Sequence, residues 1–538
     1  MRHADAAARA IKDFWTASAR SGVKLRTVWL APKVIAARTP ESLRHALAKP
    51  VDALPLDVFR ILVGSLSLAY FLRTLLESPL YSSADGLIDH ELIMAIFPVT
   101  RMGMFQPGMP LVVLQAFYVL ACLGSLAVIA GYRVKLAAAA LYVIAVSTYR
   151  WNFLVMYVDD VIMHLMFFWL LLLPVGRTLV LSEWWSQRAQ VWRRWKTTTV
   201  PGAAVRCFLW NVALIYIVAG LWKWTSPMWR NGTALYAVLK LPIAYTPDFW
   251  RPQHMPLLKT LTYTSLLLET IFPIVFFLPK GHRARYALLV AFLGFHLGMI
   301  VTLKIPFANV ACIAAMVVVF GSELMLWLRR RPRVVEEKPG TAPIALQGVI
   351  AMVMVATLTM AMLTSITVPH WRTPVRETPA VADDAARDGL KPLQMVFFVP
   401  LWIAGLAQQY QLFNWIDDRN YTVHYDVTRT DGAGVRTADP GGIFLTTTRS
   451  NLLQAYVYGV SWMQIPSGQR QQLRASIYIR SARRYCRGVE GSADVSVSST
   501  LRRINSADLN GGEQSHALLM QFRCRNGETL MQMMNLNP

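Results

Sequence analysis

The sequence predicts an all-α polytopic membrane bundle of about nine transmembrane helices, followed by a smaller β-rich extramembrane C-terminal domain. Three observations predict this fold class. The 538 residues are 54% hydrophobic and only 16% charged, which is too apolar for a soluble protein of this length. Apolar stretches of about 20 residues recur, the length that a helix needs to cross a bilayer. After about residue 370 these stretches stop, and short segments of alternating polarity begin.

The net charge of +23 indicates membrane orientation rather than nucleic-acid binding. Lys and Arg concentrate in residues 1–50 and in alternate loops, as the positive-inside rule requires. Residues 1–50 are therefore predicted to be a basic cytoplasmic arm, and the C-terminus is predicted to lie outside. We expect a multi-pass protein of a bacterial inner or plasma membrane, surrounded by the lipid bilayer and without a nucleic-acid partner.

The predicted spans lie in a transmembrane domain over residues 51–370, and each is a long apolar run bounded by charged or turn residues. They cover 54–76, 110–131, 134–149, 156–176, 203–224, 257–279, 285–303, 307–328 and 343–368. The loop 77–109 contains the apolar run 92–97. That run is predicted either to enter the membrane as a re-entrant segment or to lie on its surface.

A polar linker and a short interfacial helix are predicted over 371–408, and a β-rich extracytoplasmic domain over 409–538. The predicted strands share a period-two alternation and are separated by turn sequences. They cover 421–429, 473–479, 493–502 and 516–523. Cys486 and Cys524 lie in this domain and are candidates for a disulfide, because an extracytoplasmic compartment is oxidising. Without a catalytic motif, the domain is expected to bind a peptide or protein or to serve as a scaffold.

Ionisable side chains inside the predicted spans are functional candidates, because a charge in a bilayer is costly. They are Asp159, Asp160 and His164 in the fourth span, Lys223 in the fifth, Glu269 in the sixth and His296 in the seventh. The predicted topology puts most of them in the outer half of the bundle, with Glu269 near the midplane. The structural alternative is that Asp159 or Asp160 pairs with Lys223 and fixes helix packing.

Lys223 ends an apolar helix between two tryptophans. Such a lysine either anchors in the headgroups or acts as a base whose basicity is tuned by half-dry surroundings. The predicted catalytic residues are Lys223 as base, supported by Asp159, Asp160, His164 and His296. The predicted substrate pocket is lined by Trp222, Trp224, Trp229 and Glu269. No His or Cys cluster has the spacing of a metal site, so none is predicted.

The order of these motifs resembles the HTTM (horizontally transferred transmembrane) family, a membrane domain shared with vitamin K-dependent γ-carboxylase. The segments that carry the resemblance lie between about residues 50 and 330. They are LPLDVFRILVGSLSLAYFL, YVDDVIMHLMFFWLLLLPVGR, IVAGLWKWTSPMWRNGTALY, LLLETIFPIVFFLP and GFHLGMIVTLKIPFANVACIAAMVVVF. Each motif is weak alone, and their order makes the resemblance specific.

The resemblance implies a reduced quinone of the vitamin K or menaquinone type as the partner of the site. In the carboxylases, the lysine of this segment deprotonates vitamin K hydroquinone, and oxygen addition gives a basic alkoxide. That base removes a γ-proton from a peptide glutamate, and carbon dioxide traps the carbanion. Lys223 matches that lysine, and His296 matches a histidine of the quinone-side helix. Asp159 and Asp160 stand where the carboxylases carry an Asn-His pair, so the implied reaction is quinol oxygenation with or without carboxylation.

Two other functions are compatible with the sequence. One is a non-enzymatic membrane scaffold or peptide-export or immunity partner, whose outer domain binds another protein. The other is a transporter, which is less favoured because no inverted repeat or pair of Gly/Pro-broken helices is evident.

Overall fold

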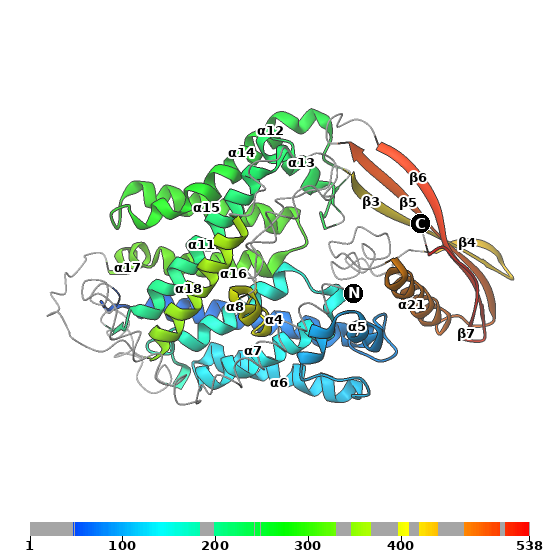
Figure 1. Cartoon of the computed structure of the whole chain (residues 1–538), viewed down its shortest axis with the longest axis horizontal. Helices are drawn as coiled ribbons and strands as arrows, with labels where there is room; N and C mark the ends of the chain where they lie inside the picture. The colour runs from blue at the N-terminus through cyan, green and yellow to red at the C-terminus, as the bar shows by residue number, and fades with distance from the viewer. Residues whose placement is uncertain are drawn as a thin grey trace.

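A computed structural model describes residues 47, 49–182, 198–241, 243–247, 249–329, 346–366, 396–407, 419–438, 467–505 and 512–536. The described chain is mostly helical, with a five-stranded sheet near its C-terminal end. The helices form a bundle, and the sheet lies with one helix at one end of that bundle (Figure 1). Most of the N-terminal arm and the linker over 371–390 lie outside the described residues.

Within the part of the chain that the structure describes, five helices are long and apolar enough to cross a membrane. They are α4 (Leu54–Tyr81), α6 (Leu111–Ala130), α11 (Ala203–Thr225), α15 (Arg283–Thr302) and α18 (Leu346–Ile366). These helices coincide with five of the predicted spans. The first of them continues well past its predicted end at residue 76.

The other predicted spans fall on helices that are shorter or broken. They are α7 (Val134–Trp151), α8 (Val158–Leu172), α14 (Met255–Ile271) with η4 (Phe272–Phe276), and α16 (Pro306–Val319) with α17 (Gly321–Arg329). The 15 residues of α8 rise only about 22 Å, less than the hydrocarbon core of about 30 Å. Pro273 lacks the N–H that would continue α14, and α16 meets α17 at 63°. Five candidate spans are therefore established, and the count of nine stays a prediction.

Short elements connect the long helices. They are β1 (Val51–Asp52), which pairs with β2 (Thr199–Val200), and α5 (His90–Ile96), η1 (Pro98–Met102), η2 (Phe153–Val155), α12 (Pro227–Asn231), α13 (Ala234–Leu239) and η3 (Pro252–His254).

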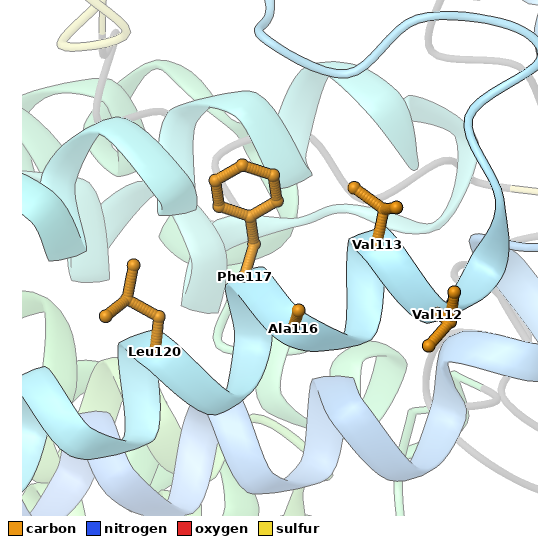
Figure 2. Close-up of a pocket in the computed structure, with 5 residues that line it drawn as sticks. All are labelled: Val112, Val113, Ala116, Phe117 and Leu120. Atoms are coloured by element: carbon orange, nitrogen blue, oxygen red, sulfur yellow. The ribbon is translucent and has the colours of Figure 1, made fainter.

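Part of the bundle surface is strongly apolar. Only 28% of the apolar window of α6 and 17% of that of α15 is buried inside the protein. Figure 2 shows the side chains of α6 that line an open surface pocket, which are Val112, Val113, Ala116, Phe117 and Leu120. Apolar patches of this extent mark contact with lipid or with another protein, because monomeric soluble proteins rarely expose them.

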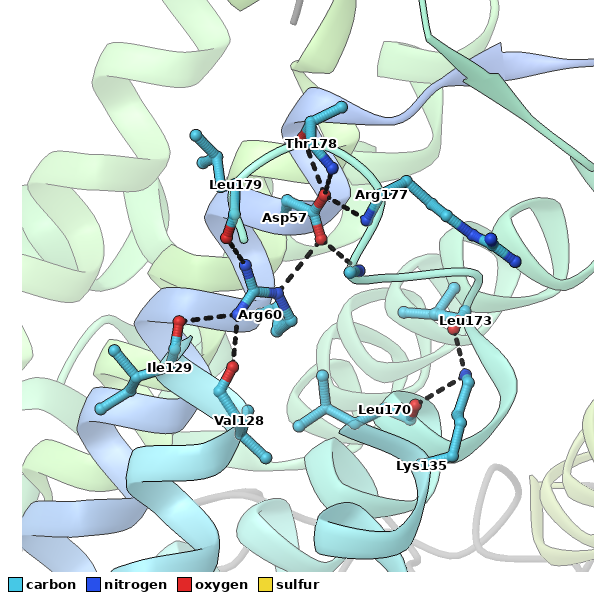
Figure 3. Close-up of polar contacts among 11 residues, drawn as sticks. Asp57, Arg60, Val128, Ile129, Lys135, Leu170, Leu173, Arg177, Thr178 and Leu179 are labelled. Carbon is cyan, nitrogen blue, oxygen red and sulfur yellow. Dashed lines mark hydrogen bonds and ion pairs between the residues drawn. The ribbon is translucent and has the colours of Figure 1, made fainter. Parts of the chain in front are cut away.

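A buried carboxylate organises the end of the bundle where α4 begins. Asp57 and Arg60 lie one turn apart in α4, both fully buried and 3.1 Å apart. The carboxylate of Asp57 accepts the backbone N–H groups of Gly176, Arg177 and Thr178, and also the Thr178 hydroxyl at 2.7 Å (Figure 3). Gly176 has a φ of +79°, a conformation open to glycine, which helps to turn the N–H groups toward the carboxylate.

At the same end of the bundle, two cationic side chains donate hydrogen bonds to main-chain carbonyls. The guanidinium of Arg60 donates to the carbonyls of Val128, Ile129 and Leu179. The ammonium of Lys135 donates to the carbonyls of Leu170, Leu171 and Leu173, at the end of α8, and Figure 3 shows the bonds to Leu170 and Leu173. Apart from that of Leu179, these carbonyls belong to the ends of α6 and α8, where the last four carbonyls of a helix lack a partner within the helix.

The C-terminal strands form one antiparallel sheet in the order β4-β3-β5-β6-β7. They are β3 (Arg419–Asp431), β4 (Gly434–Ala438), β5 (Ser492–Asn505), β6 (Gly512–Arg525) and β7 (Glu528–Met534). Val427 faces Val497 across the β3–β5 ladder, and both are fully buried. Three of the four predicted strand segments lie in these strands.

The predicted strand 473–479 is wrong, because these residues belong to the helix α21 (Ser467–Cys486). Their alternation holds only over a short window. Over the whole segment the buried apolar residues have helical spacing, and the longer period decides. They are Leu473, Ile477, Tyr478, Ala482 and Cys486. The helix packs against the sheet, and a disulfide joins Cys486 to Cys524 of β6.

The C-terminal domain docks on the loop that follows α4. Residues of α5 and its approach, among them Ile88 and Ile93, share one buried apolar cluster with α21 and the sheet. Arg480 of α21 pairs with Asp89 at 3.2 Å and donates to the carbonyl of Ala84 at 2.6 Å. The run 92–97 therefore lies mainly in α5, against the C-terminal domain, which favours the surface alternative over a re-entrant segment.

Burial and neighbouring groups at this contact shift the pKa values of Asp89 and His90. Burial opposes ionisation of Asp89, but the Leu92 N–H and the Arg480 guanidinium outweigh it and hold the pKa of Asp89 below its ordinary 3.8. Burial lowers the pKa of the neighbouring His90 from 6.5 to about 4. The imidazole of His90 stacks on Trp151, with ring centres 3.8 Å apart.

Breaking the buried pair at the start of α4 should destabilise the bundle. We expect Arg60→Met to lower the free energy of unfolding by about 3–5 kcal/mol, because Asp57 would stay buried without its cation. Unfolding in mixed detergent–SDS micelles measures this. The matched control is Arg177→Met, an exposed side chain in the turn that binds Asp57, expected to cost about 0.5 kcal/mol or less. Equal losses in both variants would contradict the role of Arg60.

Acid should loosen the loop on which the C-terminal domain docks. Local opening returns His90 to its ordinary pKa of 6.5, so the open loop binds an additional proton. The stability of α5 should then fall as the pH drops from about 6.5 to about 4, by about 3 kcal/mol at most. Amide hydrogen exchange of α5 measures this. The variant His90→Phe keeps the stack on Trp151 and should remove the pH dependence of the stability of α5. If this variant keeps the wild-type pH dependence, a group other than His90 causes it.

Candidate functional site

Lys223 lies in the last turn of α11, and its ammonium is paired with Glu269 of α14. The Nζ contacts both carboxylate oxygens, and the two side chains are only 4% and 6% exposed. The helices approach closely because Gly220 faces Thr270 one turn before the lysine. A Cβ at Gly220 would lie 2.9 Å from the Thr270 hydroxyl. Gly220 therefore lets α11 and α14 come close enough to bury the pair between them.

The short helix α12 covers this ion pair. The chain leaves α11 through Ser226 in an extended conformation and brings Trp229 over the ammonium. The Nζ of Lys223 lies 4.8 Å from the centre of the Trp229 ring, a cation–π contact. Trp222 is buried, and the half-exposed Trp224 donates to the Thr270 hydroxyl at 3.0 Å. Of the tryptophans predicted to line a pocket, Trp229 is the one placed over Lys223.

His296 of α15 forms a second buried polar group, together with Tyr216 of α11 and Asn309 of α16. The Tyr216 oxygen lies 2.6 Å from Nε2 of His296, and Nδ1 lies 2.9 Å from Oδ1 of Asn309. All three residues are at most 4% exposed. Tyr216 and Lys223 lie on the same helix, α11, about two turns apart and so on one face. We treat the two polar groups together as the candidate site.

Asp159 and Asp160 lie at helix N-termini. Asp160 accepts the N–H of Tyr157 at 2.9 Å in a capping box and the hydroxyl of Tyr70 at 2.7 Å. Asp159 accepts the N–H of Ala308, in the first turn of α16, at 2.8 Å. Carboxylates are favourable at helix N-termini, because the free N–H groups and the helix dipole stabilise negative charge. These bonds account for the burial of both acids.

The expected pairing of Lys223 with Asp159 or Asp160 is therefore wrong. Among the described residues the ion-pair partner of Lys223 is Glu269, which had been predicted only as a pocket residue. Asp159 is connected to the site only indirectly. It accepts the N–H of Ala308 in the first turn of α16, and the next residue in that helix is Asn309.

His164 contacts the segment over 396–407 that was predicted as an interfacial helix. That segment is helical over 396–403, and its last carbonyls accept hydrogen bonds from side chains of α7 and α8. Nδ1 of His164 lies 3.2 Å from the carbonyl of Gly405. Arg150 donates to Ile403 at 2.5 Å, and Tyr142 donates to Ala404. His164 therefore helps to fasten this segment, and a catalytic role for it stays a prediction.

Tyr216 and Asn309 were not among the residues predicted from the sequence. Ionisable groups inside spans are the signal on which the prediction of functional residues rests. The amide in IPFANVACIA and the phenol in NVALIYIVAG carry no charge and so do not give that signal. Any polar side chain in an apolar span is a usable signal, because it must find a hydrogen-bond partner when buried.

The arrangement places a buried Lys–Glu ion pair and a hydrogen-bonded histidine in the same helix bundle. Within the described ranges, no group of three or more His, Cys, Asp or Glu side chains is placed to hold a metal ion. Comparison with models of protein families, with curated proteins and with solved structures finds no match for this chain.

The Lys223–Glu269 pair should behave as one unit in stability. We expect Lys223→Met and Glu269→Leu each to cost about 3–5 kcal/mol of unfolding free energy, because each leaves one buried charge without its partner. The double variant Lys223→Met/Glu269→Leu should return close to wild-type stability, since it replaces the pair by apolar groups. Unfolding of the four proteins in detergent micelles measures the cycle. Additive losses would show that the two charges do not interact.

Proposed function

We propose that this chain is a membrane protein of the HTTM type, similar to vitamin K-dependent γ-carboxylase, that oxygenates a quinol with Lys223 as base. The buried Lys223–Glu269 pair carries the proposal. A buried ion pair is often no more stabilising than apolar side chains of the same size, so stability alone does not explain it. Its position in an apolar bundle supports a chemical use.

Lys223 must be uncharged to act as a base, and Glu269 supplies a place for its proton. When an ammonium proton of Lys223 moves to the Glu269 carboxylate, a neutral amine and a neutral acid remain in place of the ion pair. That amine can then take a proton from a weakly acidic hydroxyl at short range. Glu269 is thus proposed as the proton partner of the base.

The surroundings of the pair fit a reduced quinone of the vitamin K or menaquinone type. The ring of Trp229 lies over Lys223, and those of Phe272 and Phe292 pack against Tyr216, so a substrate admitted here would meet an aromatic lining. When bound, such a quinol would supply the acidic hydroxyl and the oxygen chemistry. The side chains of Lys223 and Glu269 are both buried in this structure. We therefore propose that α12 with Trp229 moves aside to admit the substrate, while Trp222 and Trp224 remain on α11.

The membrane arrangement that we propose has nine crossings, with the N-terminus inside and the C-terminal domain outside a bacterial plasma membrane. The broken and short helices then complete the crossings that the five long ones begin. The alternation of basic loops supports this orientation. The Cys486–Cys524 disulfide also supports it, since disulfides persist in oxidising compartments.

Aerobic incubation with reduced menaquinone or vitamin K tests the function. We expect the wild-type protein to form the quinone epoxide, detected by mass spectrometry. The variant Lys223→Met/Glu269→Leu should form none, although it is expected to fold, while Arg177→Met should match the wild type. Folded wild-type protein that forms no epoxide from either quinol would contradict the proposal. Epoxide formation by the double variant would remove Lys223 from the mechanism.

A non-enzymatic scaffold or peptide-export or immunity partner is the second candidate, and the outer domain favours it. That domain is fastened to the bundle, while its edge strand β4 presents Val435 to solvent with 70% of its surface exposed. An open edge of this kind can pair with an extended peptide. Loss of biological function on deletion of 409–538, with function retained in Lys223→Ala, would favour this candidate over the enzyme.

A further inference from the structure

The hydrogen bonds around Asn309 fix the proton positions on His296. Nδ2 of Asn309 donates to the carbonyl of Ile305 at 2.7 Å, a bond that only the amide nitrogen can make. The amide oxygen of Asn309 is therefore the atom that faces Nδ1 of His296 at 2.9 Å. Because an amide oxygen only accepts, Nδ1 of His296 must carry a proton.

The second ring nitrogen then has the opposite role. A neutral imidazole carries one proton, so Nε2 of His296 is an acceptor once Nδ1 is the donor. The Tyr216 hydroxyl, 2.6 Å away, donates to it. The direction of the whole chain follows, from Tyr216 through His296 and Asn309 to the carbonyl of Ile305.

Packing holds both donors and acceptors in place. The Tyr216 ring stacks on Phe272 with centres 4.3 Å apart and meets the edge of Phe292 at 5.3 Å. Asn309 lies in the first turns of α16, whose N-terminus is held by the bond from Ala308 to Asp159. The hydroxyl of Tyr216 is therefore kept on the side of Nε2.

We propose that Asn309 is a positioning residue that keeps His296 in the Nδ1–H tautomer, so that Tyr216 and His296 form a second proton acceptor beside Lys223 and Glu269. This inference rests on the proposed function. A substrate hydroxyl gives its proton to the Tyr216 oxygen, while the Tyr216 proton passes to Nε2 of His296. One substrate O–H bond breaks, one N–H bond forms and no electron is transferred. Two acceptors in one apolar site suit an aromatic substrate with two hydroxyl groups.

If Asn309 had a purely structural role, the tautomer of His296 would not matter for the reaction. In that case the three side chains only satisfy one another between helices, and any replacement that packs well would serve. The test therefore needs a measurement on the imidazole itself, together with one on the reaction.

Nitrogen-15 NMR of full-length protein labelled at histidine rings, in lipid nanodiscs, reads the tautomer directly. The His296 signals are assigned by their loss in His296→Gln. We expect a protonated Nδ1 and a bare Nε2 in the wild type and in Asn309→Asp, which keeps an acceptor facing Nδ1. Asn309→Leu should lose the Nδ1–H signal. A wild-type proton on Nε2, or an unchanged spectrum in Asn309→Leu, would overturn the inference whether or not the protein oxygenates quinols.

The reaction provides the second measurement. With reduced menaquinone, Asn309→Leu should lower kcat by about tenfold or more with little change in KM, because one of two proton acceptors is misoriented. An Asn309→Leu protein that loses the tautomer but keeps its kcat would refute the second acceptor and leave Lys223 as base. Absence of epoxide in the wild type would count against the proposed function alone.

Discussion

The carboxylate of Asp57 is the constraint on which the bundle depends. A buried carboxylate needs several donors, and Asp57 takes them from a turn that lies far away in the sequence, beyond α8. Through Arg60 it also reaches the end of α6. Nearly all of these partners are main-chain groups, so the arrangement fixes the path of the backbone more than the identity of side chains.

The position of the site follows from that constraint through α8. One end of α8 is fixed near Asp57, and its other end is fixed to α4 by the bond from Tyr70 to Asp160. With α8 in place, Asp159 sets the start of α16 and hence the depth of Asn309. The acids that the sequence offered as catalytic groups therefore have a clear geometric task, which is to bring α16 and α15 to the side of α11.

The sequence predicted helices well where length and apolarity suffice, and it predicted Lys223 at a helix end. It did not predict the partner of Lys223, because that partner depends on which helices touch. The contact between α11 and α14 requires a glycine at Gly220, whose effect is visible only when Thr270 is opposite. The span that carries the two acids was predicted to start at residue 156, close to the start of α8 at Val158, but their partners could not be predicted because the first turn of α16 comes from far along the chain. In the C-terminal domain, a window of seven residues was too short to separate a strand from the amphipathic α21.

The short α8 has a mechanical consequence. Its surface is largely buried among other helices, while α6 and α15 expose most of theirs. In the proposed membrane arrangement, a change in bilayer thickness would act through hydrophobic mismatch on the helices that touch lipid, and so on α6 and α15 rather than on α8. Arg60 ties one end of α6 to the base of the bundle, and Gln115 and Tyr118 near its other end bond to Ser78 and Ser82, so α4 and its end hold α6 along its length. The fold thus combines a buried inner frame with more exposed helices, which are the ones that a surrounding bilayer would contact.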